Sequence, residues 1–418
     1  MSIQSIKIKN GVNLHYIHTG KFKTTTLGIY FHRPLRREEA AMNALAANVI
    51  KRGCPLFPES QKLSRRLESL YGASLVTGVR KKGDSQIIHV NFEFVNERFV
   101  PGEQSVFGSV FELAKSVVFG QEGFSPEHTA QEKENLKQQI MAQINDKRTY
   151  AANRCKEIMC ADEPYGISEL GFVEDVDFTD AVNLFYHYKN AVLKSPVDIF
   201  ICGDADISAA ERLVRDMAVG IEAEGVYPET TVVTTVGEVK SVTETEQINQ
   251  GKLSMGFRTK VMPGGERYPA LLVFNAVFGG GSSSKLFNNV REKLSLAYYA
   301  NSRIDMFKGI MTVNSGIEVE NFQKAYDEIL LQLDEVKNGN ITDDEMSAAI
   351  LSTVTNIKSM TDSAPIMEDY WLGRLISGIS SGFGDVTRMV QGVTKDEVIA
   401  AAQDVELDTV YFLKGVQS

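Results

Sequence analysis

The sequence contains few cysteines and histidines, the residues that form disulfides and bind zinc. It has only four cysteines, which are Cys54, Cys155, Cys160 and Cys202. No two of them show CxxC spacing, which favours reduced thiols in a cytoplasm. None of the six histidines lies beyond His187, so the C-terminal half cannot build a histidine metal site. His15 and His18 are three positions apart in an expected strand, so their side chains should point to opposite faces and should not share a metal.

Long apolar runs and an excess of positive charge are also missing. No run approaches the roughly 18 to 20 apolar residues that a membrane helix needs. The first residues, MSIQSIKIKNGVNLHYI, alternate between apolar and polar types and lack the apolar core of a signal peptide. The net charge of −10 argues against nucleic acid or an anionic membrane as the main partner. We therefore expect a cytoplasmic protein that binds neither.

The length and the order of the expected elements indicate two domains. A chain of 418 residues is too long for one hydrophobic core. In the first half, hydrophobic periodicity predicts strands at 3–9, 13–18, 24–32 and 197–204, and a hairpin around 78–95. It predicts helices at 38–52, 60–72, 103–119, 125–160 and 178–191. The second half repeats this order, as a duplicated domain would.

The fold class and the domain boundaries follow from the repeat. Each half mixes a mainly antiparallel sheet with helices, so we expect an α+β protein. The stretch at 219–241 is polar, rich in threonine and poor in helical pattern, and it is the expected linker. The expected domains are therefore residues 1–218 and 242–418.

Three stretches in this order carry a resemblance to a known family. They are RGCPLFPESQKLSRRLESLYGASL, VRKKGDSQIIHVNFEFVNERF and FGGGSSSKLFNNVREKLSLAYY. The chain resembles, over essentially its whole length, the insulinase or pitrilysin-type zinc metallopeptidases. Within that family it is most similar to the branch that includes mitochondrial processing peptidase and the core proteins of the respiratory bc complex, and to bacterial members without the zinc motif. The resemblance implies two duplicated domains that form half of a clam-shell.

The resemblance also implies where zinc would be bound, and there the sequence departs from the family. Active members carry an HxxEH motif, whose histidines bind zinc and whose glutamate is the general base, with a third ligand further on. Alignment on the glycine of KRGC places this motif on ALAAN, so that Ala44 and Asn48 replace the histidines and Ala47 replaces the base. Glu132 matches the third ligand, whereas Gln139 replaces its acidic neighbour. One carboxylate does not hold a catalytic zinc, so we expect no metal in this chain and no peptide cleavage by it alone.

The stretch from Phe278 to Tyr299 keeps a different part of the family's site. In the family, an arginine and a tyrosine seven residues apart hold the substrate backbone and stabilise the oxyanion, and Arg291 and Tyr298 match this pair. A guanidinium and a phenol are suited to this role because both donate directed hydrogen bonds. The preceding glycine-rich loop matches one that is thought to contact substrate in subunits without zinc. Its expected binding residues are Gly279, Gly280, Gly281 and Ser282.

Other interpretations of these residues remain open or are disfavoured. A phosphate-binding loop is disfavoured because GGGSSSK lacks the GxxxxGK[ST] order. Arg291 and Tyr298 could instead be relics of the duplicated fold that pair with local carboxylates. An alternative metal site built from Glu132 and a stray histidine is disfavoured by the lack of further ligands.

Two functions fit the sequence. In the first, the chain is a catalytically incomplete subunit of a zinc metallopeptidase. It would lend Arg291 and Tyr298 to a site completed by a homologous partner that bears HxxEH and binds the zinc, and the substrate would be a peptide. In the second, the chain is a non-catalytic homodimeric peptide-binding or scaffold protein.

Overall fold

A computed structural model describes residues 3–101, 105–262 and 264–415. Within these residues the chain forms two compact units, and neither is continuous in sequence. The first contains residues up to 141, 167–229 and 361–376, and the second contains 142–166, 230–360 and the remainder from 377. The expected domains at 1–218 and 242–418 differ from these units, because 142–166 and 361–376 each belong to the unit built mainly from the other half.

The first unit is a six-stranded sheet in the order β1-β2-β6-β3-β5-β4. All neighbours are antiparallel except β2 and β6, which are parallel. Its strands are β1 (Gln4–Lys9), β2 (Val12–His18), β3 (Thr24–Pro34), β4 (Ser74–Lys82), β5 (Ser85–Val95) and β6 (Val197–Gly203). Its helices are α1 (Arg37–Ile50), α2 (Ser60–Ser69), α3 (Val106–Val118), α4 (Pro126–Ala142), α6 (Val173–Asp177), α7 (Ala181–Lys194), α8 (Ile207–Met217) and α12 (Ala364–Ile376).

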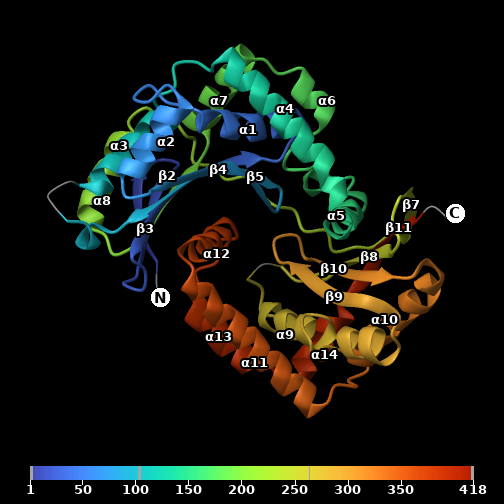
Figure 1. Ribbon diagram of the computed structural model, residues 1–418. Helices are drawn as coiled ribbons and strands as arrows, with labels where there is room; N and C mark the ends of the chain where they lie inside the picture. The colour runs from blue at the N-terminus through green and yellow to red at the C-terminus, as the bar shows by residue number, and fades with distance from the viewer. Residues whose placement is uncertain (1–2, 102–104, 263, 416–418) are drawn as a thin grey trace. The chain divides into compact units, whose positions relative to one another are not determined.

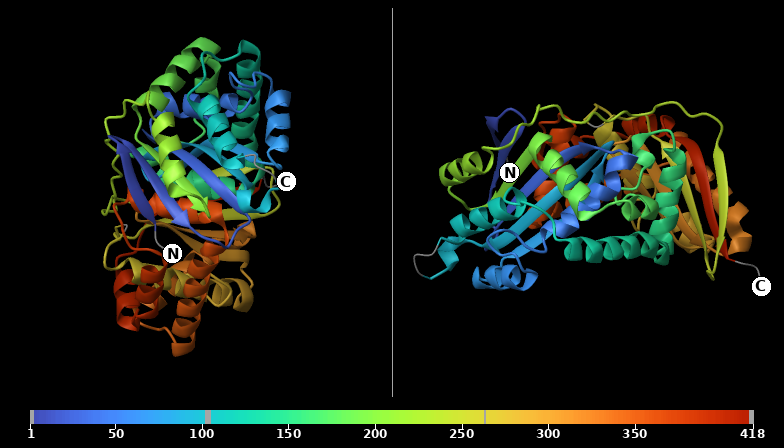
Figure 2. Two further views of the ribbon diagram at one scale, coloured as in Figure 1. Left: turned by 90° about the vertical axis from the view of Figure 1, so that its left-hand side faces the viewer. Right: turned by 90° about the horizontal axis from the view of Figure 1, so that it is seen from above.

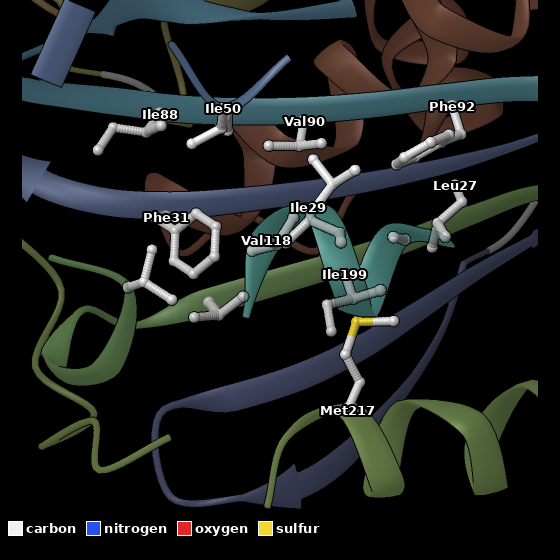
Figure 3. Close-up of a cluster of buried hydrophobic side chains, with 14 of the residues drawn as sticks. Leu27, Ile29, Phe31, Ile50, Ile88, Val90, Phe92, Val118, Ile199 and Met217 are labelled. Carbon is white, nitrogen blue, oxygen red and sulfur yellow. The ribbon is translucent and has the colours of Figure 1, made fainter. Parts of the chain in front are cut away.

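The core of the first unit lies between this sheet and the helices on one of its faces, among them α1, α3 and α8 (Figure 1). Alternate residues of β3 and β5 point into it, because side chains alternate across a strand. Figure 3 shows these rows packing against side chains from α1, α3, α8 and β6. The labelled residues are Leu27, Ile29, Phe31, Ile50, Ile88, Val90, Phe92, Val118, Ile199 and Met217. Helix α12 packs against β3 and β6.

The second unit is a five-stranded sheet in the order β7-β11-β8-β10-β9. Its strands are β7 (Lys240–Glu246), β8 (Gly251–Arg258), β9 (Ala297–Asp305), β10 (Ile310–Ile317) and β11 (Glu406–Gly415). Its helices are α5 (Lys147–Met159), α9 (Tyr268–Phe278), α10 (Phe322–Lys337), α11 (Asp343–Ser359), α13 (Phe383–Gln391) and α14 (Lys395–Gln403), with a π-helix at Leu286–Lys293. In this unit β7 and β11 are parallel and the other neighbours antiparallel.

The two sheets confirm the predicted duplication and the α+β class. The order β2-β6-β3-β5-β4 corresponds strand for strand to β7-β11-β8-β10-β9, including the single parallel pair. Helix α5 packs against β8, β10 and β11 of the second unit, while α12 packs against β3 and β6 of the first. Each sheet is therefore completed by a helix from the other half of the sequence, and Figure 2 gives two further views of these elements.

One expected helix is two helices in the structure. The predicted helix at 125–160 is interrupted after α4, and α5 begins again behind Asp146. The Asp146 carboxylate accepts a hydrogen bond from the backbone N–H of Thr149, so it caps the new helix. The break lies close to the boundary at 141, where the chain passes from the first unit to the second. The start of the expected helix at 103–119 falls outside the described residues, and α3 begins at Val106.

Candidate functional site

The positions of the zinc motif lie on α1, in the first unit. Ala44 and Ala47 are 3% and 0% exposed and belong to the hydrophobic core. Asn48 is half-buried, and its side-chain oxygen accepts a hydrogen bond from the Lys51 ammonium at 3.5 Å. Neither alanine can bind a metal or take a proton from water. The local structure of this segment is that of an ordinary core helix.

Glu132, which matches the third zinc ligand, is held by an arginine. Its side chain lies on α4 and is only 4% exposed. The guanidinium of Arg52, just beyond the end of α1, donates to Oε1 of Glu132 through Nε at 2.5 Å and also through its Nη2. The Asn135 amide donates to the same oxygen at 3.2 Å. Arg52, and not a metal ion, thus supplies the positive charge beside the Glu132 carboxylate.

These residues do not fit the zinc ion that the family implies. A catalytic zinc site needs about three protein ligands, and here one carboxylate is present and is already engaged by Arg52. Across the part of the chain that the structure describes, no group of three or more histidine, cysteine, aspartate or glutamate residues is placed to hold a metal. His15 and His18 follow the predicted alternation: His15 contacts Asp198, whereas His18 contacts the hydroxyl of Tyr16.

A buried polar network next to Ala44 was not predicted from the sequence. Asn43 is fully buried and donates through its side-chain amide to the Oε1 of Gln86 at 2.7 Å. The Nε2 of His187 lies 2.7 Å from Oδ1 of Asn43. Burial lowers the pKa of His187, and Nε2 donates this bond because the amide oxygen of Asn43 can only accept. Three side chains from α1, β5 and α7 thereby satisfy one another beside the former zinc helix, and no spacing in the sequence relates them.

The glycine-rich loop begins in the second unit at the end of α9, and its glycines have different roles. A Cβ on Gly279 would lie 2.6 Å from the Ser302 hydroxyl, and one on Gly280 would lie 2.8 Å from the Asn275 amide. A Cβ on Gly281 would meet nothing within 4 Å, and Gly281 and Ser282 are exposed. The first two glycines are required by close packing, whereas the exposed tip is free to contact a ligand.

Arg291 and Tyr298 lie at the surface of the second unit, and each has a local contact. Arg291 is on the π-helix, where its guanidinium carbon is 4.5 Å from the centre of the Phe287 ring and its Nε is 3.5 Å from the Glu292 carboxylate. Tyr298 is on β9, is 63% exposed, and donates its hydroxyl hydrogen to Glu318 at 2.8 Å. That hydrogen bond raises the pKa of Tyr298, because ionisation would place two negative charges together. Both residues can reach solvent, and neither is buried in the packing of the sheet.

Comparisons with known proteins agree with this fold and identify the family of the chain. Residues 177–352 match the family model described as the peptidase M16 inactive domain. The chain belongs to the M16 peptidase family, and to its inactive members. It is 33% identical over 420 residues to the probable inactive metalloprotease YmfF of Bacillus subtilis strain 168, and the alignment covers 99% of both chains.

Solved structures show the same architecture. A conserved protein from Enterococcus faecalis V583 is 30% identical and gives a TM-score of 0.93 over 100% of both chains. A chain of Complex III2 from Candida albicans, with Inz-5 bound, is 15% identical and gives a TM-score of 0.76 over 99% of this chain and 96% of that chain. The second likeness shows the fold alone. In the described ranges, no helix has both the length and the apolar character that crossing a bilayer requires.

Proposed function

We propose that this chain is the zinc-free subunit of a metallopeptidase formed from two homologous chains. Its second unit lends Arg291 and Tyr298 to a site whose zinc and general base are carried by a partner with an intact HxxEH motif. The substrate is a peptide, whose carbonyl oxygen becomes an oxyanion when water attacks. Arg291 and Tyr298 supply hydrogen-bond donors to that oxygen and to the substrate backbone. The pair acts in the cytoplasm.

One observation carries the proposal, and it is a contrast within the chain. The two histidine positions hold the buried Ala44 and the half-buried Asn48, the base position holds Ala47, and the remaining ligand Glu132 is paired with Arg52. By comparison, 42% of the Arg291 side chain and 63% of Tyr298 are exposed to solvent. Long polar side chains that only served packing would be expected to lie against the sheet. The exposed tip of the glycine-rich loop, at Gly281 and Ser282, adds a surface that a peptide can contact.

The alternative is a homodimeric scaffold or peptide-binding protein without any catalytic role. It is favoured by the contacts that Arg291 and Tyr298 already make, since Phe287 and Glu318 could be their permanent partners. On this view the Arg291 and Tyr298 side chains stabilise the surface of β9 and the π-helix only.

Reconstitution with the HxxEH-bearing homologue from the same genome separates the two functions. Hydrolysis of a fluorogenic peptide should require both chains. Arg291→Ala in the mixed pair should lower kcat about 100-fold, as removal of one oxyanion donor does, and Tyr298→Phe should also lower it. Matched controls are Arg388→Ala and Tyr186→Phe, which remove exposed side chains of the same types (78% and 69% exposed) and should leave kcat unchanged. Equal activity of the partner alone, or of the Arg291→Ala pair, would contradict the proposal.

A further inference from the structure

Two cations and a tyrosine lie together in the second unit, on the face of the sheet that α5 covers. In the sheet, Gly316 of β10 is paired with Lys252 of β8 on one side and Tyr299 of β9 on the other. A Cβ on Gly316 would lie 2.5 Å from the Tyr299 ring. The Tyr299 ring therefore lies over Gly316 of β10, where the glycine leaves room for it, and it extends toward β8.

Two cations are held against this ring. The guanidinium carbon of Arg148, on the first turn of α5, is 4.2 Å from the ring centre of Tyr299. The ammonium nitrogen of Lys252 is 5.8 Å from the same centre. Because both charges face one ring, they repel each other. Burial and then the charge of Arg148 lower the pKa of Lys252, which is the response expected of an ammonium beside a second cation.

Among the described residues, no carboxylate lies within ion-pair distance of these two cations. The structure records no ion pair for Arg148 or Lys252 there, and the Lys252 ammonium donates only to the side-chain oxygen of Gln250. Asp146 interacts electrostatically with Arg148 and Tyr299, but its carboxylate accepts hydrogen bonds from the backbone and hydroxyl of Thr149 as the helix cap. Arg148 is exposed and Lys252 is half-buried; by comparison, the buried Lys285 ammonium of the same unit lies 3.0 Å from Glu345.

The geometry points to an oxyanion-binding site formed by Arg148, Lys252 and Tyr299, with Gly316 as its floor. The ligand is a carboxylate or a phosphate group, because a guanidinium, an ammonium and a phenolic O–H all donate to oxyanions. Tyr299 is half-buried, and its phenolic hydroxyl is the third group that can donate to an oxyanion. Binding of an anion would relieve the repulsion between the two cations, and this is a specific source of affinity.

Calorimetric titration of the isolated chain at fixed ionic strength tests the site. The probes are inorganic phosphate, an acetylated tetrapeptide with a free C-terminal carboxylate, and the same tetrapeptide with a C-terminal amide. The wild-type chain should bind phosphate, the carboxylate peptide or both, and should bind the amide more weakly than the carboxylate form. Binding of phosphate alone identifies a free anion as the ligand, and binding of the carboxylate peptide alone identifies a peptide terminus.

Substitutions assign the binding to these residues. Arg148→Ala and Lys252→Ala should each weaken the observed binding about tenfold, which corresponds to about 1.4 kcal/mol. Arg303→Ala, on the same strand as Tyr299, and Lys324→Ala are the matched controls, because both remove exposed cations and should leave the binding unchanged. Circular dichroism verifies that each variant is folded. No saturable binding by wild type, or equal binding by Arg148→Ala, would overturn the inference.

The titration needs no partner chain and no catalytic activity. Its outcome is therefore separate from that of the proposed subunit role. In wild type, the pKa of Lys252, followed by NMR after isotopic methylation of lysines, should rise when the anion binds.

Discussion

The residues that match the family's catalytic site are mostly buried in the first unit and accessible to solvent in the second. In the first unit, the carboxylate that corresponds to a zinc ligand is buried and paired with Arg52, and the two histidine positions hold the buried Ala44 and the half-buried Asn48. In the second unit, the side chains of Arg291 and Tyr298 reach solvent; Arg291 contacts Phe287 and Glu292, and Tyr298 contacts Glu318. The comparison teaches that a carboxylate buried as deeply as Glu132 needs a counter-charge, which Arg52 supplies, whereas the solvent-accessible groups of the second unit do not.

The first unit contains a second buried carboxyl, which should produce the largest effect on stability. Glu368 of α12 is 1% exposed and accepts hydrogen bonds from the hydroxyls of Thr26 and Tyr30, at 2.8 Å in the second case. Burial, opposed in part by these hydrogen bonds and by Arg80, raises the pKa of Glu368 from 4.5 to about 7. Glu93 is a further, smaller influence in the same direction as burial.

The sign of the pH dependence follows from that raised pKa. The protonated carboxyl of Glu368 is favoured in the folded state, so its contribution is fully present below about pH 4.5 and is lost as the pH rises through about 7. The loss should approach about 3 kcal/mol. Glu368→Gln should remove this part of the pH dependence of the free energy of unfolding in urea, whereas Glu93→Gln, at an exposed position, should not. Identical pH profiles for Glu368→Gln and wild type would contradict the assignment.

Breaking the pair of Arg52 and Glu132 should have a somewhat smaller effect on the free energy of unfolding. Arg52→Ala leaves the Glu132 carboxylate buried without a counter-charge, which should cost about 2 to 3 kcal/mol of unfolding free energy, less than a fully buried pair because the Arg52 side chain is 31% exposed. Urea denaturation at neutral pH measures the change.

A double variant shows whether that loss of stability comes from the unpaired charge or from lost packing. Adding Glu132→Gln to Arg52→Ala should recover most of the stability, because the carboxamide carries no charge. Lys62→Ala serves as the control, since its exposed pair with Glu59 should contribute less than about 1 kcal/mol. If the double variant were no more stable than Arg52→Ala, the loss would reflect packing and not charge.

Breaking the exposed hydrogen bond between Tyr298 and Glu318 in the second unit should have the smallest effect on stability. Glu318→Ala removes the acceptor of the Tyr298 hydroxyl, so the pKa of Tyr298 should fall toward its ordinary value of about 10. Difference absorbance of phenolate, with Tyr298→Phe subtracted, follows this single titration. The urea midpoint should not change. A Tyr298 pKa that stayed raised in Glu318→Ala would contradict the assignment of Glu318 as the cause.

The sequence predicted the duplication, the α+β class and most elements, because amphipathic periodicity and turn residues are local signals. The break before α5 also had a local signal in the Asp146 cap, although the continuous periodicity obscured it. The exchange of α5 and α12 between the units could not be predicted, since periodicity identifies a helix but not the sheet that it covers. The same holds for Arg52 and Glu132, which lie 80 residues apart and meet only through tertiary packing.

The sequence also showed that Ala44 and Asn48 occupy the histidine positions of the motif and Ala47 the base position, and the structure adds that Arg52 pairs with the remaining carboxylate, Glu132. It did not distinguish Gly279 and Gly280, which are required by close contacts, from Gly281, which is not. It gave no sign of the site at Arg148, Lys252 and Tyr299, because the three residues come from separate elements and share no motif.

The central claim is that this chain works with a homologous partner that carries the zinc. The most direct measurement is affinity purification of the tagged chain from its native host, with the co-purifying proteins identified and quantified. The account predicts a partner of similar length with an intact HxxEH motif, present in a one-to-one ratio. Recovery of this chain alone, or only with unrelated proteins, would contradict the account and favour the homodimeric scaffold.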